Sequence, residues 1–231
     1  MSIPDQLSQQ HIRSFVRRTS RLTRAQQRAL TELWNRFGIE ENTALLVPEV
    51  LFGRQAPLIL EIGFGDGESL AAMAQVNPQV DYLGIEVHRP GVGHLLLRAE
   101  ALSLSNLRVL CADAVGVLEK QLPDGCLERI QIFFPDPWPK ARHHKRRLIQ
   151  PLFAALLARK LKLTGQLHIA TDWKDYADHI LNTLSAVHEL VNTATTGGFV
   201  PRPKHRLLTK FEERGQRLGH GVWDMVFERR L

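Results

Sequence analysis

Short apolar runs of strand length alternate along the chain with longer stretches in which apolar side chains recur at helical spacing. The strand-like runs are Leu58–Ile62, Tyr82–Val87, Leu107–Cys111, Arg129–Phe134 and Gln166–Ala170. The helical stretches are Gly67–Gln75, Gly91–Leu104, Pro151–Leu163 and Trp173–Val187. This alternation predicts an α/β fold, in which a doubly wound, mostly parallel sheet carries helices on both faces.

The last third of the chain contains one more predicted helix and then a segment of different composition. Pro151 suits a first helical turn, and Gly165 suits the end of the same helix. Phe199–Leu231 is rich in turn and charged residues and ends in a strand-like run, Val222–Phe227. No internal repeat or low-complexity linker interrupts the chain, so we expect a single main domain.

Composition narrows the class of protein. The chain has 231 residues, of which 44% are hydrophobic and 23% charged, as in an ordinary soluble globular protein. It contains neither an apolar run of membrane-spanning length nor a secretory signal. Two cysteines, Cys111 and Cys126, make no disulfide framework. We therefore expect a cytoplasmic protein without a membrane partner.

The positive charge is concentrated in two places. Residues 1–36 hold seven arginines against two acids, whereas the formal charge of the whole chain is +6. Residues 140–147 hold five further cations and no acid. Two such patches suit a phosphate backbone, although a solvated tail and a solubilising loop would look the same. We expect residues 1–36 to form a mobile basic arm, because it has few apolar anchors, and residues 37–231 to form the domain.

Ligands of open parallel sheets bind at the carboxyl ends of the strands, and the first strand ends in a glycine-rich turn. In Glu61–Gly67 the third glycine follows the second by two residues, where a dinucleotide-binding fingerprint requires three. Glu61 lies within an otherwise apolar strand, where a carboxylate needs a cationic or hydrogen-bonding partner. That partner is either the amino group of a ligand or a set of backbone amides.

Acids also follow the next two strands. Glu86 lies about twenty residues beyond the glycines, a spacing that suits the hydroxyl groups of an adenosine ribose. Asp113 either accepts a hydrogen bond from the adenine amino group or caps the following helix. Three acids at successive strand ends after a glycine turn are difficult to explain as three caps.

The fourth strand leads into the most specific stretch of the sequence. Pro135, Pro137 and Pro139 stiffen the chain, so that Asp136 is presented on a rigid hook at the active face. Trp138 suits stacking on a base. The basic run behind the hook suits phosphate contacts; its members are Lys140, Arg142, Lys145, Arg146 and Arg147. His143 and His144 are adjacent and have no cysteine nearby, so we expect no metal site.

Two further stretches carry weaker signals. Asp172 suits a helix N-cap with Asp175 at the third helical position, and the same location faces the predicted ligand side. Thr209–Glu212 combines a hydroxyl, a cation, a ring and an acid in a predicted loop, which by itself indicates no particular chemistry.

Taken together, these motifs resemble the bacterial tRNA (guanine-N7)-methyltransferases of the TrmB type, from about residue 13 to the C-terminus. The proline-rich hook followed by the basic run is the most specific part of the resemblance. The resemblance implies a Rossmann-like class I methyltransferase fold with a seven-stranded sheet whose last strand is antiparallel. It also implies S-adenosylmethionine as cofactor, tRNA as partner, and methylation of N7 of the variable-loop guanosine at position forty-six.

The resemblance also implies roles for individual residues. The cofactor would be bound by Glu61, Gly63, Gly65, Glu86, Asp113 and Asp136, and Asp136 would be catalytic. The substrate would be bound by Lys140, Asp172, Thr209, Lys210, Phe211 and Glu212. RNA would be contacted by Arg142, His143, His144, Lys145, Arg146 and Arg147. Because one chain holds both cofactor and basic elements, we expect no obligate protein partner.

The chemistry of guanine N7 fits such a site. N7 has a lone pair and no proton, so the enzyme needs chiefly to position the reactants and to stabilise charge. Methylation makes the purine cationic, and a carboxylate that accepts from the ring N1–H and the exocyclic amine strengthens its hold as that charge develops. Asp136 is the first candidate for this carboxylate and Asp172 the second.

Three rival functions are less well supported. A nicotinamide-dependent oxidoreductase would require a different glycine spacing and has no use for the basic block. A non-catalytic RNA-binding module would not need the cofactor acids, all of which are present. A methyltransferase acting on an exocyclic amine must remove a proton and tends to use an Asn-bearing Pro-Pro turn, unlike the Pro-Asp-Pro-Trp-Pro sequence here.

Overall fold

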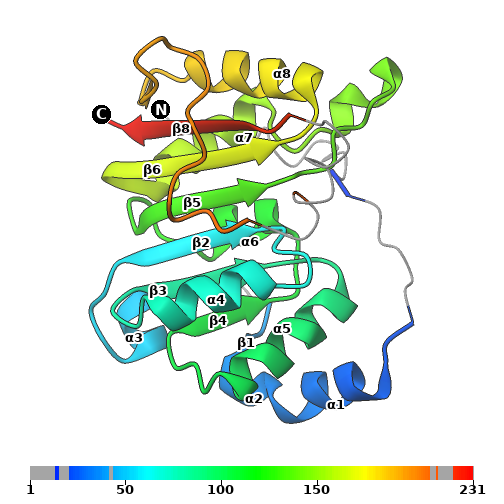
Figure 1. Cartoon of the computed structure of the whole chain (residues 1–231). Coiled ribbons are helices and arrows are strands. Elements are labelled where there is room, and N and C mark those ends of the chain that lie inside the picture. The colour runs from blue at the N-terminus through cyan, green and yellow to red at the C-terminus, as the bar shows by residue number, and fades with distance from the viewer. Residues whose placement is uncertain (1–13, 16–20, 42–43, 209–211, 213–220, 231) are drawn as a thin grey trace.

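One eight-stranded sheet forms the centre of the computed structural model, which describes residues 14–15, 21–41, 44–208, 212 and 221–230 (Figure 1). The strands are β1 (Gly38–Ile39), β2 (Leu58–Ile62), β3 (Asp81–Ile85), β4 (Leu107–Leu110), β5 (Leu127–Phe133), β6 (Leu161–Thr171), β7 (Leu190–Asn192) and β8 (Trp223–Arg229). Their order across the sheet is β1-β4-β3-β2-β5-β6-β8-β7. All neighbours from β1 to β6 pair in parallel, and β8 is antiparallel to both β6 and β7.

The α/β prediction is confirmed, and the six strand-like runs of the sequence correspond to β2–β6 and β8. The strand count differs from the expected seven, because the described chain has eight. The short edge strand β1 pairs with β4 through Gly38 and Ile39 only. A two-residue strand has no alternation of apolar and polar side chains, so periodicity does not reveal it.

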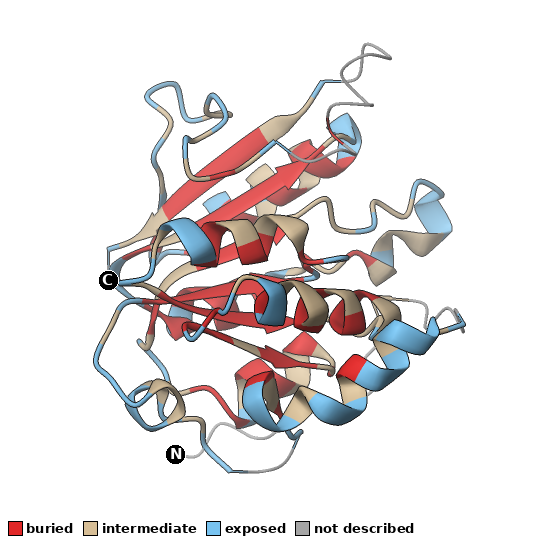
Figure 2. Ribbon diagram, turned by 60° about the horizontal axis from the view of Figure 1, so that its bottom comes forward, coloured by how far each residue is buried: buried red, intermediate tan, exposed pale blue. Residues whose placement is uncertain are grey.

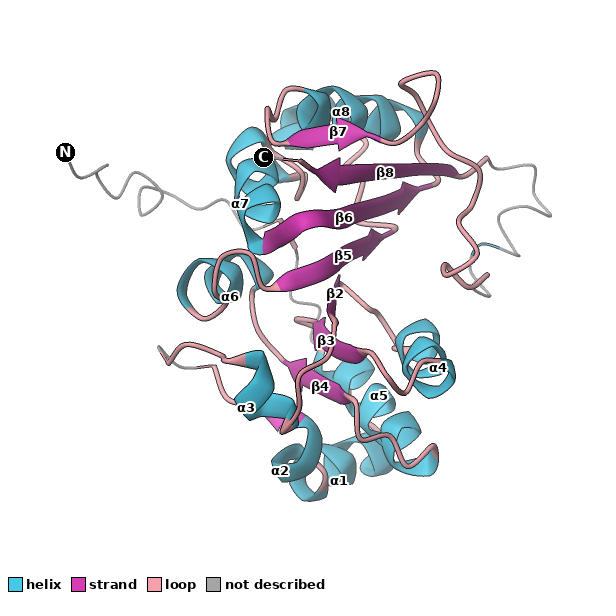
Figure 3. Ribbon diagram, turned by 90° about the vertical axis from the view of Figure 1, so that its left-hand side faces the viewer, coloured by secondary structure: helices cyan, strands magenta, loops and turns pink. Residues whose placement is uncertain are grey.

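Helices cover both faces of the sheet, as Figure 3 shows edge-on. The helices are α1 (Arg24–Glu32), α2 (Trp34–Phe37), α3 (Pro48–Phe52), α4 (Glu68–Val76), α5 (Arg89–Ala101), α6 (Ala114–Lys120), α7 (Pro151–Lys160) and α8 (Lys174–Ser185), with a 3-10 helix, η1, at Ala141–Arg146. One apolar cluster joins α1, α2, α4 and α5 to β3 and β4, and a second joins α6, α7 and α8 to the opposite face. Figure 2 shows that the buried residues follow the strands and the inner sides of the helices.

The expected basic arm is shorter than predicted at its C-terminal end. Thr23 caps α1 in a capping box, in which its hydroxyl accepts from Gln26 N at 3.2 Å and its own N–H donates to Gln26 Oε1 at 2.9 Å. Ala29 and Phe37 are buried in the cluster that contains α5. Residues 24–37 are therefore part of the folded domain, because a few well-placed apolar side chains suffice to dock a short amphipathic helix.

The end of α7 also differs from the prediction. The helix stops at Lys160, and β6 begins at once with Leu161 in an extended conformation. Gly165 does not end the helix but lies inside β6, where an added Cβ would come within 2.9 Å of the Leu127 carbonyl oxygen. The glycine therefore permits the close approach of β5 and β6 rather than terminating a helix.

The sheet reverses its winding between β2 and β5, which are neighbours in the sheet although β3 and β4 separate them in sequence. Such a reversal opens a crevice at the carboxyl ends of the two strands, where open α/β sheets bind their ligands. The loops that follow β2 and β5 are the glycine turn and the proline hook. Within the described residues, no helix is long and apolar enough to cross a membrane.

Candidate active site

The glycine turn after β2 offers an open backbone surface. Gly63 and Gly65 adopt φ values of 75° and 62°, in the left-handed region that favours glycine. Gly63 N–H donates to the Ile85 carbonyl oxygen at 2.8 Å, which ties the turn to the end of β3. Among the described residues, no atom lies within 4 Å of a Cβ built on either glycine. The turn thus leaves room for a ligand to approach its backbone closely.

Glu86 at the end of β3 organises this turn. Its Oε2 accepts from Gly65 N at 2.9 Å, and its Oε1 accepts from Val87 N at 2.7 Å and His88 N at 2.9 Å. Each carboxylate oxygen can accept more than one hydrogen bond, so this arrangement is compatible with binding a ribose hydroxyl as well. Glu86 therefore joins the glycine turn to the N-terminal end of α5.

Glu61 is buried in the middle of the sheet with an exposure of 3%. Its described hydrogen-bond partner is the side chain of Gln131 on β5, with Gln131 Nε2 at 3.3 Å from Glu61 Oε2. The pKa of Glu61 is raised from its ordinary value of 4.5 to about 8, chiefly because burial disfavours the charged form; the Gln131 hydrogen bond lowers this pKa, and the charge of Glu86 contributes a smaller increase. No backbone amide among the described residues donates to Glu61, so the alternative in which backbone amides hold this carboxylate is not observed.

An ammonium group is the complement that this carboxylate needs, because a buried carboxylate is stabilised in its charged form by a nearby cation. The side chain of Gln131 is also buried, and its Oε1 has no hydrogen-bond partner among the described residues. An unsatisfied acceptor beside a protonated acid is the environment expected where a donor-bearing ligand binds. The residues present therefore fit the amino end of S-adenosylmethionine.

Asp113 after β4 is a helix cap, one of its two predicted roles. It is the N-cap residue of α6, and its Oδ1 accepts from Val115 N at 3.1 Å. This cap leaves the carboxylate at the carboxyl end of β4, on the same edge as Glu86. A contact with adenine stays a prediction.

The hook after β5 is strained and firmly held. Phe134 and Trp138 have positive φ values of 54° and 46°, which cost energy in residues other than glycine. Phe134 N–H donates to the Ala170 carbonyl oxygen at 2.8 Å, and Trp138 Nε1 donates to the Ser14 carbonyl oxygen at 3.1 Å. Asp136, at the tip, is exposed and takes no hydrogen bond from any described residue. A free carboxylate is thus presented on a constrained loop.

Arg147 holds the other end of the hook and differs from its predicted role as an RNA contact. It is 3% exposed, its Nε donates to the Pro137 carbonyl oxygen at 2.9 Å, and its Nη2 pairs with Asp175. Its guanidinium lies over the Tyr176 ring, 4.9 Å from the centroid. A side chain so enclosed has no surface to offer a phosphate, so Arg147 is an internal anchor in this structure.

The remaining basic residues form an exposed surface on η1. Lys140, Arg142 and Lys145 are exposed, and Arg146, His143 and His144 are partly exposed. Desolvation lowers the pKa of His143, and the surrounding cations lower it further. His143 and Arg146 contact the Trp138 ring, with the Arg146 guanidinium 5.1 Å from its centroid. Trp138 is thus engaged within the protein, which makes it a poorer stacking platform than the sequence indicates.

Asp172 is not the helix cap that the sequence suggested. The N-cap position of α8 belongs to Trp173, whose N–H donates to Thr171 Oγ1 at 3.3 Å, and Asp175 pairs with Arg147 instead of closing a capping box. The carboxylate of Asp172 takes no hydrogen bond from the described residues. The pairing of Phe133 with Ala170 places Asp136 and Asp172 on the ends of adjacent strands. Asp172 is therefore available for a substrate.

The predicted substrate segment is only partly visible, because Thr209, Lys210 and Phe211 lie outside the described residues. Glu212 is 2% exposed, and its two carboxylate oxygens accept from Arg206 at 2.5 and 2.8 Å. Arg206 also binds Asp224, which contacts His168, and His168 contacts His205. These four residues were absent from the site that the sequence predicts. Polar residues inside the apolar strands β6 and β8 were the available signal.

Among the residues that the structure describes, no group of three or more His, Cys, Asp or Glu side chains is arranged to hold a metal ion. His143 and His144 accordingly have ring and cation neighbours rather than acidic ones, apart from a 3.9 Å approach of His144 to Asp175. The described site is thus composed of carboxylates, backbone amides and cations.

Comparison with solved structures shows the fold. The 16S rRNA methyltransferase KamB aligns over 79% of this chain and 92% of its own, with a TM-score of 0.58 and 16% identity. The antibiotic-resistance methyltransferase Kmr aligns over 79% of this chain and 91% of its own, with a TM-score of 0.54 and 14% identity. The described sheet and helices therefore have the class I methyltransferase arrangement.

Comparison with known sequences shows the family. The family model described as "Putative methyltransferase" matches residues 55–225. The tRNA (guanine-N(7)-)-methyltransferase of Photorhabdus laumondii is 56% identical over 94% of this chain and 91% of its own length. That of Alcanivorax borkumensis is 54% identical over 95% and 92%. This chain belongs to the family of bacterial tRNA (guanine-N7)-methyltransferases.

Proposed function

We propose that this protein transfers a methyl group from S-adenosylmethionine to N7 of the variable-loop guanosine of tRNA, at position forty-six. S-adenosylmethionine supplies an electrophilic methyl group on a sulfonium. The N7 lone pair forms the new N–C bond while the S–C bond breaks and its electron pair remains on sulfur. The products are S-adenosylhomocysteine and a cationic 7-methylguanosine, so no proton has to be removed from N7.

The cofactor residues follow from the geometry of the strand ends. Gly63 and Gly65 provide the open turn, and buried Glu61 is matched to an ammonium group. Glu86 holds the turn and would accept from the ribose hydroxyls, and Asp113, which caps α6 at the end of β4, would accept from the adenine amine. All these groups are tied to the sheet, so the cofactor would be bound by a preorganised surface.

The proposed substrate-binding residues come from the loops after β5 and β6, on the other side of the crevice. Asp136 accepts from the guanine N1–H and exocyclic amine, and Asp172 and Lys140 hold the base and its phosphate. As positive charge develops on the purine, those donors become more acidic and the hydrogen bonds to a carboxylate strengthen. The guanosine has to leave its stack to enter the site. Of the predicted substrate-binding residues 209–212, Glu212 is the one that the structure describes.

The basic surface on η1 binds the tRNA backbone. Arg142, Lys145 and Arg146 provide cations for phosphates, and His143 and His144 provide hydrogen bonds. The arm before residue 24 adds further arginines. We expect the enzyme to act in the cytoplasm, where it meets tRNA, and to need no obligate protein partner.

The observation that carries this proposal is the free carboxylate of Asp136 on a hook that is fixed at both ends. The test is transfer of labelled methyl from S-adenosylmethionine to unmodified tRNA, followed by digestion and mass spectrometry of the nucleosides. Label in 7-methylguanosine that disappears when the variable-loop guanosine is replaced supports both the reaction and its position. Label in a different nucleoside would overturn the proposal.

A further inference from the structure

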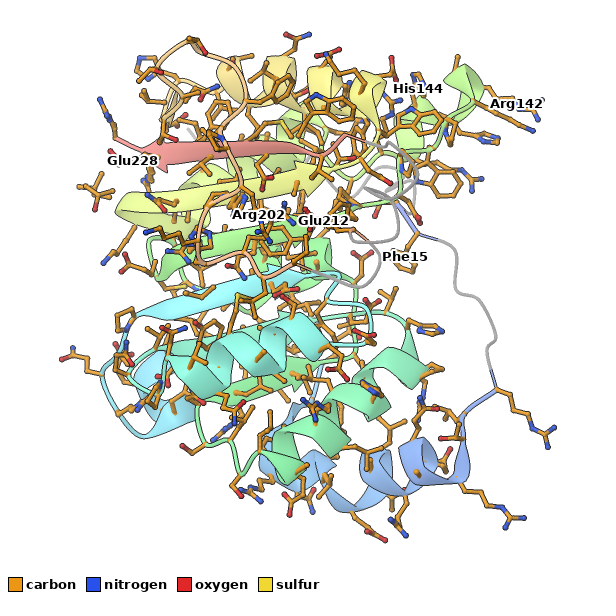
Figure 4. The ribbon with its side chains drawn as sticks, in the orientation of Figure 1. Phe15, Arg142, His144, Arg202, Glu212 and Glu228 are labelled. Atoms are coloured by element: carbon orange, nitrogen blue, oxygen red, sulfur yellow. The ribbon has the colours of Figure 1, made fainter. Side chains whose placement is uncertain are left out.

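A buried cluster of charged side chains lies between the antiparallel end of the sheet and the hook. Arg206, in the loop before the predicted substrate segment, is 2% exposed. Its Nε and Nη2 donate to Asp224 on β8 at 2.7 and 2.9 Å, and its Nη1 and Nη2 donate to Glu212 at 2.5 and 2.8 Å. Figure 4 shows Glu212 over the sheet, level with the ends of β5 and β6. One guanidinium thus binds two carboxylates side by side.

Two histidines extend this cluster across β6. His168 Nε2 lies 2.7 Å from Asp224 Oδ1, and His168 Nδ1 lies 2.9 Å from His205 Nε2. Since an ionised carboxylate only accepts, Nε2 of His168 carries the proton, and His205 donates to its bare Nδ1. Burial lowers the pKa of both rings, that of His205 to about 3. Both histidines are neutral at neutral pH, so His168 orients Asp224, and His205 orients His168, without adding charge.

The same guanidinium touches the base of the hook. The carbon at the centre of the Arg206 guanidinium lies 5.9 Å from the centroid of the Phe133 ring and 5.7 Å from that of Phe134. Phe134 is the residue with positive φ that directly precedes Pro135 and Asp136. Arg206 is therefore in contact with both the strained start of the hook and the last residue of the predicted substrate segment.

The cost of this arrangement indicates a role beyond packing. A buried ion pair is often no more stabilising than apolar residues of the same size, because both charges lose their hydration. What it provides is a fixed geometry, because a guanidinium binds carboxylates in one plane through paired hydrogen bonds. Here the geometry connects β6, β8, the start of the hook and Glu212.

We propose that Arg206 is a positioning residue for methyl transfer, which fixes Glu212 and the start of the Asp136 hook in one arrangement. Glu212 is then held in place by Arg206. This inference rests on the proposed function, since it assigns a role in that reaction. It goes beyond the resemblance, which implies a substrate-binding role for Glu212 and no role for Arg206.

A double-mutant cycle tests the proposal, with Arg206→Lys, Glu212→Gln and the double variant compared with the natural protein. Lysine keeps the charge but cannot form the paired hydrogen bonds. We expect each single variant to lower kcat for tRNA by about 10-fold or more, because small displacements of reacting groups are costly. Binding of S-adenosylmethionine, measured by calorimetry, should stay within about 2-fold. The double variant should be no slower than the slower single variant.

The matched control is Arg54→Lys. Arg54 donates to buried Asp81 through Nε at 3.0 Å and Nη2 at 2.5 Å, at the amino end of β3 and away from the strand ends that form the site. This variant should lower Tm and leave kcat unchanged, which separates loss of stability from loss of positioning. All rates are measured well below the lowest Tm of the set.

Two results would overturn the proposal. If Arg206→Lys has the kcat of the natural protein, the cluster serves stability alone. If Glu212→Gln lowers kcat by the same factor with and without Arg206, the two residues act independently and Arg206 does not position Glu212. If Arg206→Lys does not fold, Asp224→Asn replaces it in the same cycle, and kcat and S-adenosylmethionine binding are measured in the same way. The nucleoside that the natural protein makes is identified in the same assay, so an error in the proposed function is recognised separately.

Discussion

The proposed cofactor side of the site, residues 61–67, 86 and 113, is held mainly by bonds to backbone groups, whereas the proposed substrate side is held by side chains from distant parts of the chain. Glu86 and Asp113 bind amides one or two residues ahead of them, and Glu86 also binds the glycine turn. On the substrate side, Arg147 reaches Asp175, Arg206 reaches Asp224, and Trp138 reaches Ser14. The first side is therefore fixed largely by local contacts, and the second by contacts between residues far apart in sequence.

Asp136 belongs to the proposed substrate side, and its replacement should have the largest effect on kcat of all the variants. Asp136→Ala is expected to lower kcat by about 10²- to 10³-fold, because it removes the group that stabilises the developing charge. The affinity for S-adenosylmethionine should change by only a few fold, since the cofactor frame is intact. Single-turnover rates and calorimetric binding on the same protein measure both. Turnover close to that of the natural protein would remove Asp136 from the mechanism.

The exposed cations of η1 should have the next largest effect, and on binding alone. Arg142→Ala with Arg146→Ala is expected to weaken tRNA binding about 10-fold or more at moderate salt. The slope of log affinity against log salt should become shallower by about 1 to 2, because two phosphate contacts are lost. Filter binding over a series of salt concentrations gives the slope. An unchanged slope would mean that this surface does not bind phosphates.

Arg147 and Arg146 are neighbours in sequence with opposite surroundings, and so provide a matched pair. Arg147→Lys is expected to lower kcat by about 10-fold, because lysine cannot reproduce the hydrogen bonds to Pro137 and Asp175 that fix the hook. Arg146→Lys keeps a partly exposed charge and should behave like the natural protein. Neither change should alter the salt slope. Equal kcat values for the two variants would mean that Arg147 does not fix the hook, and its predicted role as an RNA contact would stand.

The sequence predicts the cofactor side more completely than the substrate side for a physical reason. The glycine turn and the acids at the ends of β2, β3 and β4 are fixed by where strands end, and strand ends can be read from apolar runs. Burial of Arg147 within a basic run, and the pairing of Asp175 with Arg147 in place of a capping box, depend on contacts between the hook and α8. Such contacts join residues that are far apart in the chain, and no local pattern encodes them.

The proposed cofactor side can be tested by measuring whether Glu61 releases a proton when S-adenosylmethionine binds. This is the smallest of the expected effects. With a pKa of about 8, Glu61 is protonated below that pH in the free protein. A bound ammonium group favours the carboxylate, so binding releases a proton and affinity falls as pH falls from about 7.5 to 6.5, by up to about 8-fold. The α-ammonium of the ligand stays largely protonated in this window. Calorimetry in two buffers of different ionisation enthalpy measures the proton released. Glu61→Gln should bind more weakly and independently of pH, and a natural protein that binds without proton release would show that Glu61 is already ionised.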